Sequence, residues 1–143
     1  MPIPESVAMV SAALLWAIIP AFVVRPAVLK VCEFRPSLFA TYIAFAAGFL
    51  AVIAWREAVL YVREPFMVQY TGTAILIGWS ASIAGGLLLL IFSVSRFIRD
   101  AQQKPIGFGS AIIVTILALI WTFPIALVIW IVSAFYFLPT LSG

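Results

Sequence analysis

Side chains that can do acid–base, nucleophilic or metal chemistry are scarce in this chain. Its 143 residues include no histidine, one cysteine and five carboxylates. A single cysteine excludes an intrachain disulfide, a four-cysteine zinc site and a self-contained iron–sulfur cluster. Haem ordinarily takes a histidine ligand, and no serine here has a histidine or lysine beside it to activate it. We therefore expect no enzyme activity, no catalytic residue, no metal site and no cofactor of the chain's own.

Ion transport usually leaves a charged side chain inside the membrane, because an intramembrane charge is costly and persists where it is used. Here every acidic residue lies at or beyond the end of an apolar stretch: Glu5, Glu33, Glu57, Glu64 and Asp100. Hydroxyl groups do occur within the stretches, but they usually bond to their own helix backbone or across a helix interface. A proton relay or an ion-coupled carrier is therefore disfavoured.

The composition indicates which solvent surrounds the chain. Hydrophobic residues make up 66% of it, charged residues 9%, and the mean hydropathy is +1.24. A soluble domain could not carry that much apolar surface, so we expect lipid to cover most of it. About 20 apolar helical residues cross a hydrocarbon core of roughly 30 Å. Windows of that length predict an all-α membrane protein, a single domain over 1–143 with four transmembrane helices at 6–24, 38–55, 73–95 and 110–138.

The distribution of lysine and arginine predicts the orientation, because these residues resist translocation when they lie in short loops. Six of them lie in the first and third loops: Arg25, Lys30, Arg35, Arg96, Arg99 and Lys104. The middle loop holds Arg56 and Arg63, and neither tail holds any. We therefore expect both termini on the non-cytoplasmic side of a multi-pass protein of a bacterial or organelle inner membrane.

The two basic loops also carry local signals. Proline follows arginine on both sides of residues 27–34, which predicts a short interfacial helix. Its apolar residues are expected to face lipid: Val28, Val31, Cys32 and Phe34. Glycine, proline and glutamine within 96–109 predict a compact turn. The six basic side chains can hold anionic lipid headgroups, so bound lipids are expected; alternatively, they only set the topology. No basic run alternates with aromatic residues outside the membrane, so nucleic acid is not an expected partner.

The middle loop has a different character, because it contains balanced charges. Arg56-Glu57 recurs seven residues later as Arg63-Glu64, and nothing before the following proline breaks a helix. The second helix is therefore expected to continue to residue 64, with each kind of charge on its own face. These four residues predict a surface for docking a partner, while the simpler interpretation is a solvated helix end with snorkelling arginines.

Small residues recur at four-residue spacing within the apolar stretches, which puts them on one helix face and lets backbones approach closely. The predicted packing interface consists of Ala40, Ala44 and Gly48 on the second helix and Gly78, Ser82, Gly85 and Gly86 on the third. Two prolines, Pro20 and Pro124, each predict a kink, because each leaves a carbonyl one turn earlier without its donor. Such kinks can shape a groove for a lipid or a quinone-like tail.

The scarcity of catalytic groups favours a non-enzymatic accessory or scaffold subunit of a larger energy-transducing, photosynthetic or transport complex. Its expected partners are unlike membrane subunits and anionic lipids. The alternative is a small homo-oligomeric channel or carrier, whose pathway forms between copies around the Gly78 face and the hydroxyl groups.

Overall fold

The computed structural model describes residues 4–63, 72–100 and 102–141, and this part of the chain is helical throughout apart from its connections. The helices are α1 (Glu5–Trp16), α2 (Ile18–Cys32), α3 (Leu38–Arg63), α4 (Gly72–Phe97) and α5 (Phe108–Leu141). Four helical segments are long and apolar enough to cross a membrane: Glu5–Cys32, Leu38–Val62, Ile75–Phe97 and Phe108–Tyr136. The all-α prediction with four such segments is confirmed.

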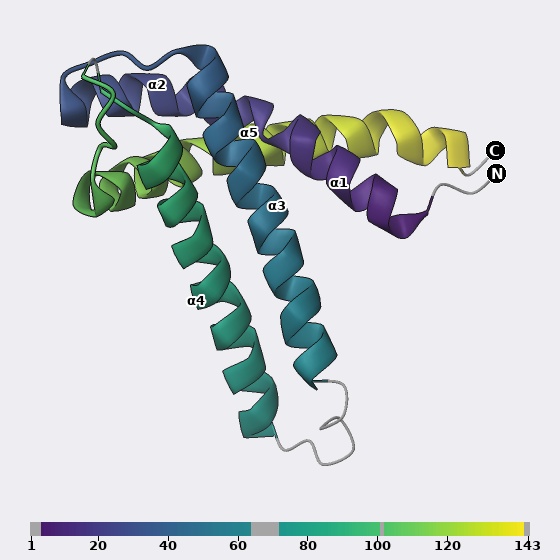
Figure 1. Ribbon diagram of the computed structural model, residues 1–143. Helices are drawn as coiled ribbons and strands as arrows, with labels where there is room; N and C mark the ends of the chain where they lie inside the picture. Colours follow the sequence, from purple (N-terminus) through teal and green to yellow (C-terminus); the bar gives the residue numbers. More distant parts are fainter. Residues whose placement is uncertain (1–3, 64–71, 101, 142–143) are drawn as a thin grey trace.

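The first segment bends where Pro20 predicts a kink. Pro20 removes the N–H that the Trp16 carbonyl would accept, and α1 ends at Trp16 while α2 begins at Ile18. The axis changes direction at this junction (Figure 1). Tyr42 of α3 donates a hydrogen bond from its hydroxyl to the Leu14 carbonyl at 3.1 Å, one turn before the break. In contrast, α5 continues through Pro124 without interruption.

The short interfacial helix expected over 27–34 is wrong. Residues up to Cys32 continue α2 directly through Pro26; the helix ends at Cys32, and the next residue, Glu33, has a left-handed φ of 61°. A proline inside a helix costs about 3 kcal/mol in lost bonding and ring contact. Val24 and Val28, one turn apart and both fully buried, pack into the core on either side of Pro26. Val28 therefore faces the protein and not lipid.

The helices form two arms that share one end (Figure 1). One arm is the antiparallel pair α3 and α4; the other consists of the first segment, α1 and α2, together with α5, which packs against α2. The core lies where α2, α3, α4 and α5 meet, and its fully buried side chains include Val24, Phe45, Val94, Ile98 and Val114. Away from this junction the arms diverge, so both described chain ends, the end of α3 and the start of α4 lie far from the core.

Much apolar surface stays uncovered within the described chain. The second half of α5 is the clearest case, because consecutive residues point around the whole helix and all are exposed: Leu127 45%, Val128 60%, Ile129 41%, Trp130 68% and Ile131 40%. No other described helix therefore packs on this stretch. In water such a surface would be strongly unfavourable, since burial is worth about 25 cal/mol per Å² of apolar area.

Candidate functional site

The predicted packing interface lies mostly at the contact between α3 and α4. Gly48 approaches Leu90 so closely that a methyl group there would overlap the leucine side chain, and Gly86 has the Val52 methyls 3.4 and 3.7 Å from the position of a Cβ. Ala44, Gly48 and Gly86 are buried, and the other four members are half-buried: Ala40, Gly78, Ser82 and Gly85. The glycine face of α4 is thus largely used within the chain.

Gly85 has a specific neighbour that the sequence does not reveal. The Trp55 indole lies over it, so that a Cβ on Gly85 would overlap the ring. The indole N–H donates to the Ala81 carbonyl at 3.2 Å. Glycine at this position therefore lets an aromatic side chain of α3 lie directly on the α4 backbone.

The hydroxyl groups in the contact region differ in their hydrogen bonds, and that of Ser93 links two helices. Ser93 of α4 donates to the Ala44 carbonyl of α3 at 2.7 Å, in a buried position. Thr41 donates to carbonyls of its own helix end, Leu38 at 2.9 Å and Ser37 at 3.2 Å. The Thr115 and Thr122 hydroxyls on α5 are buried without a hydrogen-bond partner among the described residues.

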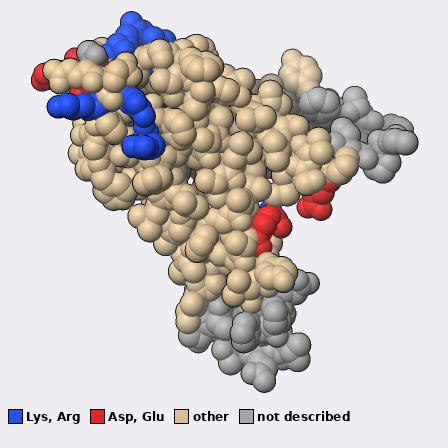
Figure 2. Space-filling model, in the orientation of Figure 1, with Lys and Arg blue, Asp and Glu red and all other residues tan. Residues whose placement is uncertain are grey.

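The six basic residues of the first and third loops lie at the shared end of the two arms, where Figure 2 shows the lysine and arginine side chains gathered. Arg25 is half-buried and donates from Nε to the Pro36 carbonyl at 3.1 Å, which ties α2 to the start of α3. The others are exposed: Lys30, Arg35, Arg96, Arg99 and Lys104. This end carries only two acidic residues, Glu33 and Asp100, so its charge is strongly positive.

The third loop is a compact turn, as the sequence predicts. Asp100 organises it, because one carboxylate oxygen accepts from the N–H groups of Gln102 and Lys104, each at 2.9 Å. Arg99 pairs with Pro105 in a short antiparallel bridge. Gln103 and Gly107 take left-handed φ values of 61° and 85°, which close the turn before α5 begins.

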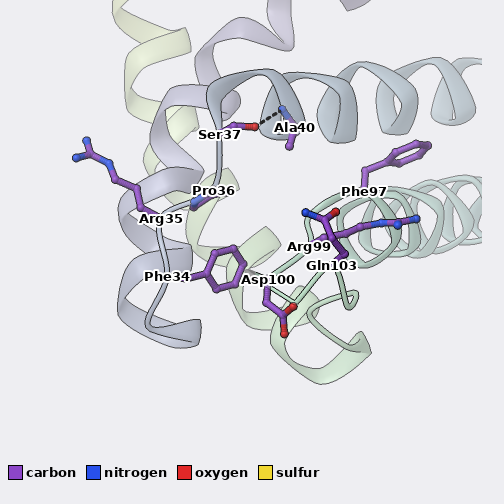
Figure 3. Close-up of a pocket in the computed structure, with 9 residues that line it drawn as sticks. All are labelled: Phe34, Arg35, Pro36, Ser37, Ala40, Phe97, Arg99, Asp100 and Gln103. Atoms are coloured by element: carbon purple, nitrogen blue, oxygen red, sulfur yellow. Dashed lines mark hydrogen bonds between the residues drawn. The ribbon is translucent and has the colours of Figure 1, made fainter.

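A cavity of about 370 Å³ lies between the first and third loops (Figure 3). The first loop and the start of α3 contribute Phe34, Arg35, Pro36, Ser37 and Ala40. The end of α4 and the third loop contribute Phe97, Arg99, Asp100 and Gln103. Its lining therefore includes basic, acidic, neutral polar and aromatic residues; the Phe34 ring points into the space, whereas the Arg35 and Arg99 side chains extend away from it on opposite sides (Figure 3).

The predicted docking surface is only partly described. Arg56 and Glu57 are exposed and form a weak ion pair at 3.8 Å. The Arg63 side chain and Glu64 lie outside the described residues. Glu57 also lines a cavity of about 340 Å³ with Glu5, Met9 and Ile53, between α1 and α3. Glu5 and Glu57 are far apart in the sequence, so no sequence pattern indicates that both line this cavity.

An apolar groove of about 320 Å³ runs along the α3–α4 pair, lined by Phe49, Val52, Gly86 and Leu90 among others, with Arg56 at its edge. Its shape follows from the small residues of α4, since Gly86 leaves room that a larger side chain would fill. Cys32 is half-buried and packs against the core, so it is a packing residue in this structure. Among the described residues no group of three histidine, cysteine or carboxylate side chains is placed to hold a metal ion.

A scan against models of known protein families found no match to this chain. Searches of curated proteins and of solved structures found no significant match either.

Proposed function

We propose that the protein is a non-enzymatic integral membrane subunit that joins a larger assembly, with both termini on the non-cytoplasmic side. The observation that carries the proposal is the pair of diverging arms. A membrane domain that worked alone would be expected to pack all four long helices together along their length, whereas here the α3–α4 pair and the arm formed by α1, α2 and α5 meet only at one end (Figure 1). Unlike subunits packed on α5 and between the arms would complete the bundle.

The charge distribution supports the proposed orientation. Six of the eight basic residues lie at the shared end of the arms, where Figure 2 shows them gathered, whereas Glu5 begins α1 and Glu57 lies near the end of α3, both away from that end (Figure 1). The positive-inside rule puts that end in the cytoplasm. There its basic side chains would meet anionic lipid headgroups, at about 1 kcal/mol of attraction for each basic residue near the surface.

The homo-oligomeric channel is the weaker candidate. It needs the glycine face of α4 and the hydroxyl groups to line a pathway between copies. Gly86 instead lies against Val52 of the same chain, and Ser93 is bonded to the Ala44 carbonyl. The Thr41 hydroxyl bonds to its own helix end. Gly86 and these two hydroxyl groups are therefore engaged within the chain, which leaves the Thr115 and Thr122 hydroxyls on α5 as the polar groups without a partner among the described residues.

Photo-crosslinking in native membranes tests the proposal. A benzophenone amino acid at Trp130, which is 68% exposed on α5, should crosslink to an unlike membrane protein of fixed mass. The control places the same group at Phe45, which is fully buried and also aromatic, and should give no crosslink between chains. Gentle extraction followed by native mass spectrometry should show the same partner at a fixed ratio. Crosslinks from Trp130 only to a second copy, in a ring of identical chains, would overturn the proposal in favour of the channel.

A further inference from the structure

The apolar groove between α3 and α4 covers about half of the membrane thickness. Helix α3 begins at the shared end of the arms (Figure 1), so at 1.5 Å per residue Phe49 lies about 16 Å and Arg56 about 27 Å along it. Helix α4 finishes at the same end, and Leu90 lies about 10 Å and Ser82 about 22 Å from there. Because the hydrocarbon core is roughly 30 Å thick, the groove extends from near its middle to the boundary away from the shared end.

The two ends of this groove differ in polarity. Arg56 and Ser82 lie at the end that reaches the membrane boundary, where an arginine side chain can extend to the level of the headgroups. The rest of the lining is apolar: Phe49, Val52, Ile83, Gly86, Leu87 and Leu90. Hydrocarbon walls with one guanidinium at the headgroup level are complementary to the two parts of a phospholipid, the acyl chain and the phosphodiester.

The Arg56 guanidinium is available to such a ligand. Its Nη1 lies 3.8 Å from a carboxylate oxygen of Glu57, which is beyond hydrogen-bonding distance, and both side chains are more than half exposed. An exposed ion pair is worth at most about 1 kcal/mol. The two residues also face different neighbours, because Arg56 lines the α3–α4 groove whereas Glu57 lines the cavity between α1 and α3. Guanidinium N–H groups therefore remain for an acceptor at the end of the groove.

We propose that this groove binds one phospholipid of the non-cytoplasmic leaflet, with the phosphodiester at Arg56 and one acyl chain along Val52, Gly86 and Leu90. A partner helix is a poorer fit, because a helix is about 10–12 Å across and would pass through both leaflets, whereas the groove ends near the middle of the bilayer. The leaflet rests on the membrane insertion and orientation given under Proposed function. The site needs no protein partner, since one chain supplies both walls.

The test maps where a lipid with a diazirine in one acyl chain crosslinks to the purified full-length chain in detergent micelles. Phosphatidylglycerol and diacylglycerol with identical acyl chains are compared at equal concentration, so the probes differ in the phosphodiester headgroup. We expect phosphatidylglycerol to label the groove residues about tenfold more strongly than diacylglycerol. Arg56→Gln should lower this label about tenfold, whereas Glu57→Gln should not lower it. Glu57→Gln is the matched control, because Glu57 is the adjacent, similarly exposed partner of the ion pair but does not line the groove.

A second pair of variants tests the groove without changing charge. Ser82→Phe places a ring in the groove and should lower the phosphatidylglycerol label, while Ser80→Phe, at an exposed position of α4 outside the groove, should leave it unchanged. Equal labelling by the two probes would overturn the site, because it would show binding of the hydrocarbon chain alone.

Equal loss of label in Arg56→Gln and Glu57→Gln would also overturn it, by showing that only the ion pair matters. These two variants change exposed side chains, so they test the site even if Ser82→Phe does not fold. Because the chain is assayed alone, failure of the lipid site leaves the accessory-subunit proposal to its own crosslinking test.

Discussion

Two adjacent glycines on α4 allow the close α3–α4 contact to be tested with an internal control. Gly85→Ala and Gly86→Ala make the same chemical change on the same helix, and each gains about 1 kcal/mol of helix propensity. They differ in their surroundings. A methyl group on Gly85 would overlap the Trp55 indole, whereas one on Gly86 would make ordinary contact with Val52 at 3.4 Å.

The magnitude follows from this difference, because the propensity gain cancels between the two variants. Forcing an extra methyl group into a packed contact costs about 1–3 kcal/mol. Displacing the indole also breaks its hydrogen bond to the Ala81 carbonyl, worth about 0.6 kcal/mol on average between membrane helices. Gly85→Ala should therefore have a free energy of unfolding about 1.6–3.6 kcal/mol lower than Gly86→Ala.

The assay is SDS titration of the protein in mixed micelles, followed by far-ultraviolet circular dichroism. A second measurement combines Gly85→Ala with Trp55→Leu, which removes the ring that the methyl group strikes. The double variant should recover at least about 1 kcal/mol relative to the sum of the single changes, as expected for residues in contact. Equal stabilities for Gly85→Ala and Gly86→Ala, together with additive effects in the double variant, would refute the close contact.

Three further outcomes are expected. Ser93→Ala should lower the free energy of unfolding by about 0.6 kcal/mol, and by up to about 1.7 kcal/mol, in the same titration, because the interhelical hydrogen bond is lost; no change would mean that the bond does not form. Pro20→Ala should straighten the junction of α1 and α2 and lengthen a spin-label distance across it, while Pro26→Ala should not, since α2 already continues through Pro26. In a cysteine-free background, a membrane-impermeant maleimide should label a cysteine at Ser6 in intact cells and not one at Gln103; the reverse pattern would contradict the proposed orientation.

The helix positions could be predicted from the sequence because they depend on local physics. A hydrocarbon-length stretch without charges is almost certain to be helical, since a backbone in lipid must satisfy its own hydrogen bonds. The compact third loop could be predicted in the same way, because glycine and proline are local signals for a turn. The absence of a helix breaker before Pro65 predicted that the second helix continues beyond its apolar part, and α3 does extend to Arg63.

The behaviour of the prolines could not be read from local signals. Pro20 and Pro26 both lie in the first segment, yet the helix breaks before the first and runs through the second. Val24 and Val28, on either side of Pro26, are buried against residues far along the chain, and no local signal reveals that contact. The Trp55–Gly85 contact and the cavity between the loops were missed for the same reason, since each brings together residues from separate segments.

The position of the core also constrains how the protein is made. Val28 of α2 and Val114 of α5 are both fully buried, but the ribosome makes them several seconds apart at about 5–20 residues per second. During that interval the α3–α4 hairpin can form from neighbouring segments, while the α2 surface that later meets α5 stays bare. Release of α5 into the membrane is then the closing step of biogenesis. A chain that stops before α5 would present Val24 and Val28 uncovered and be a ready target for membrane quality control.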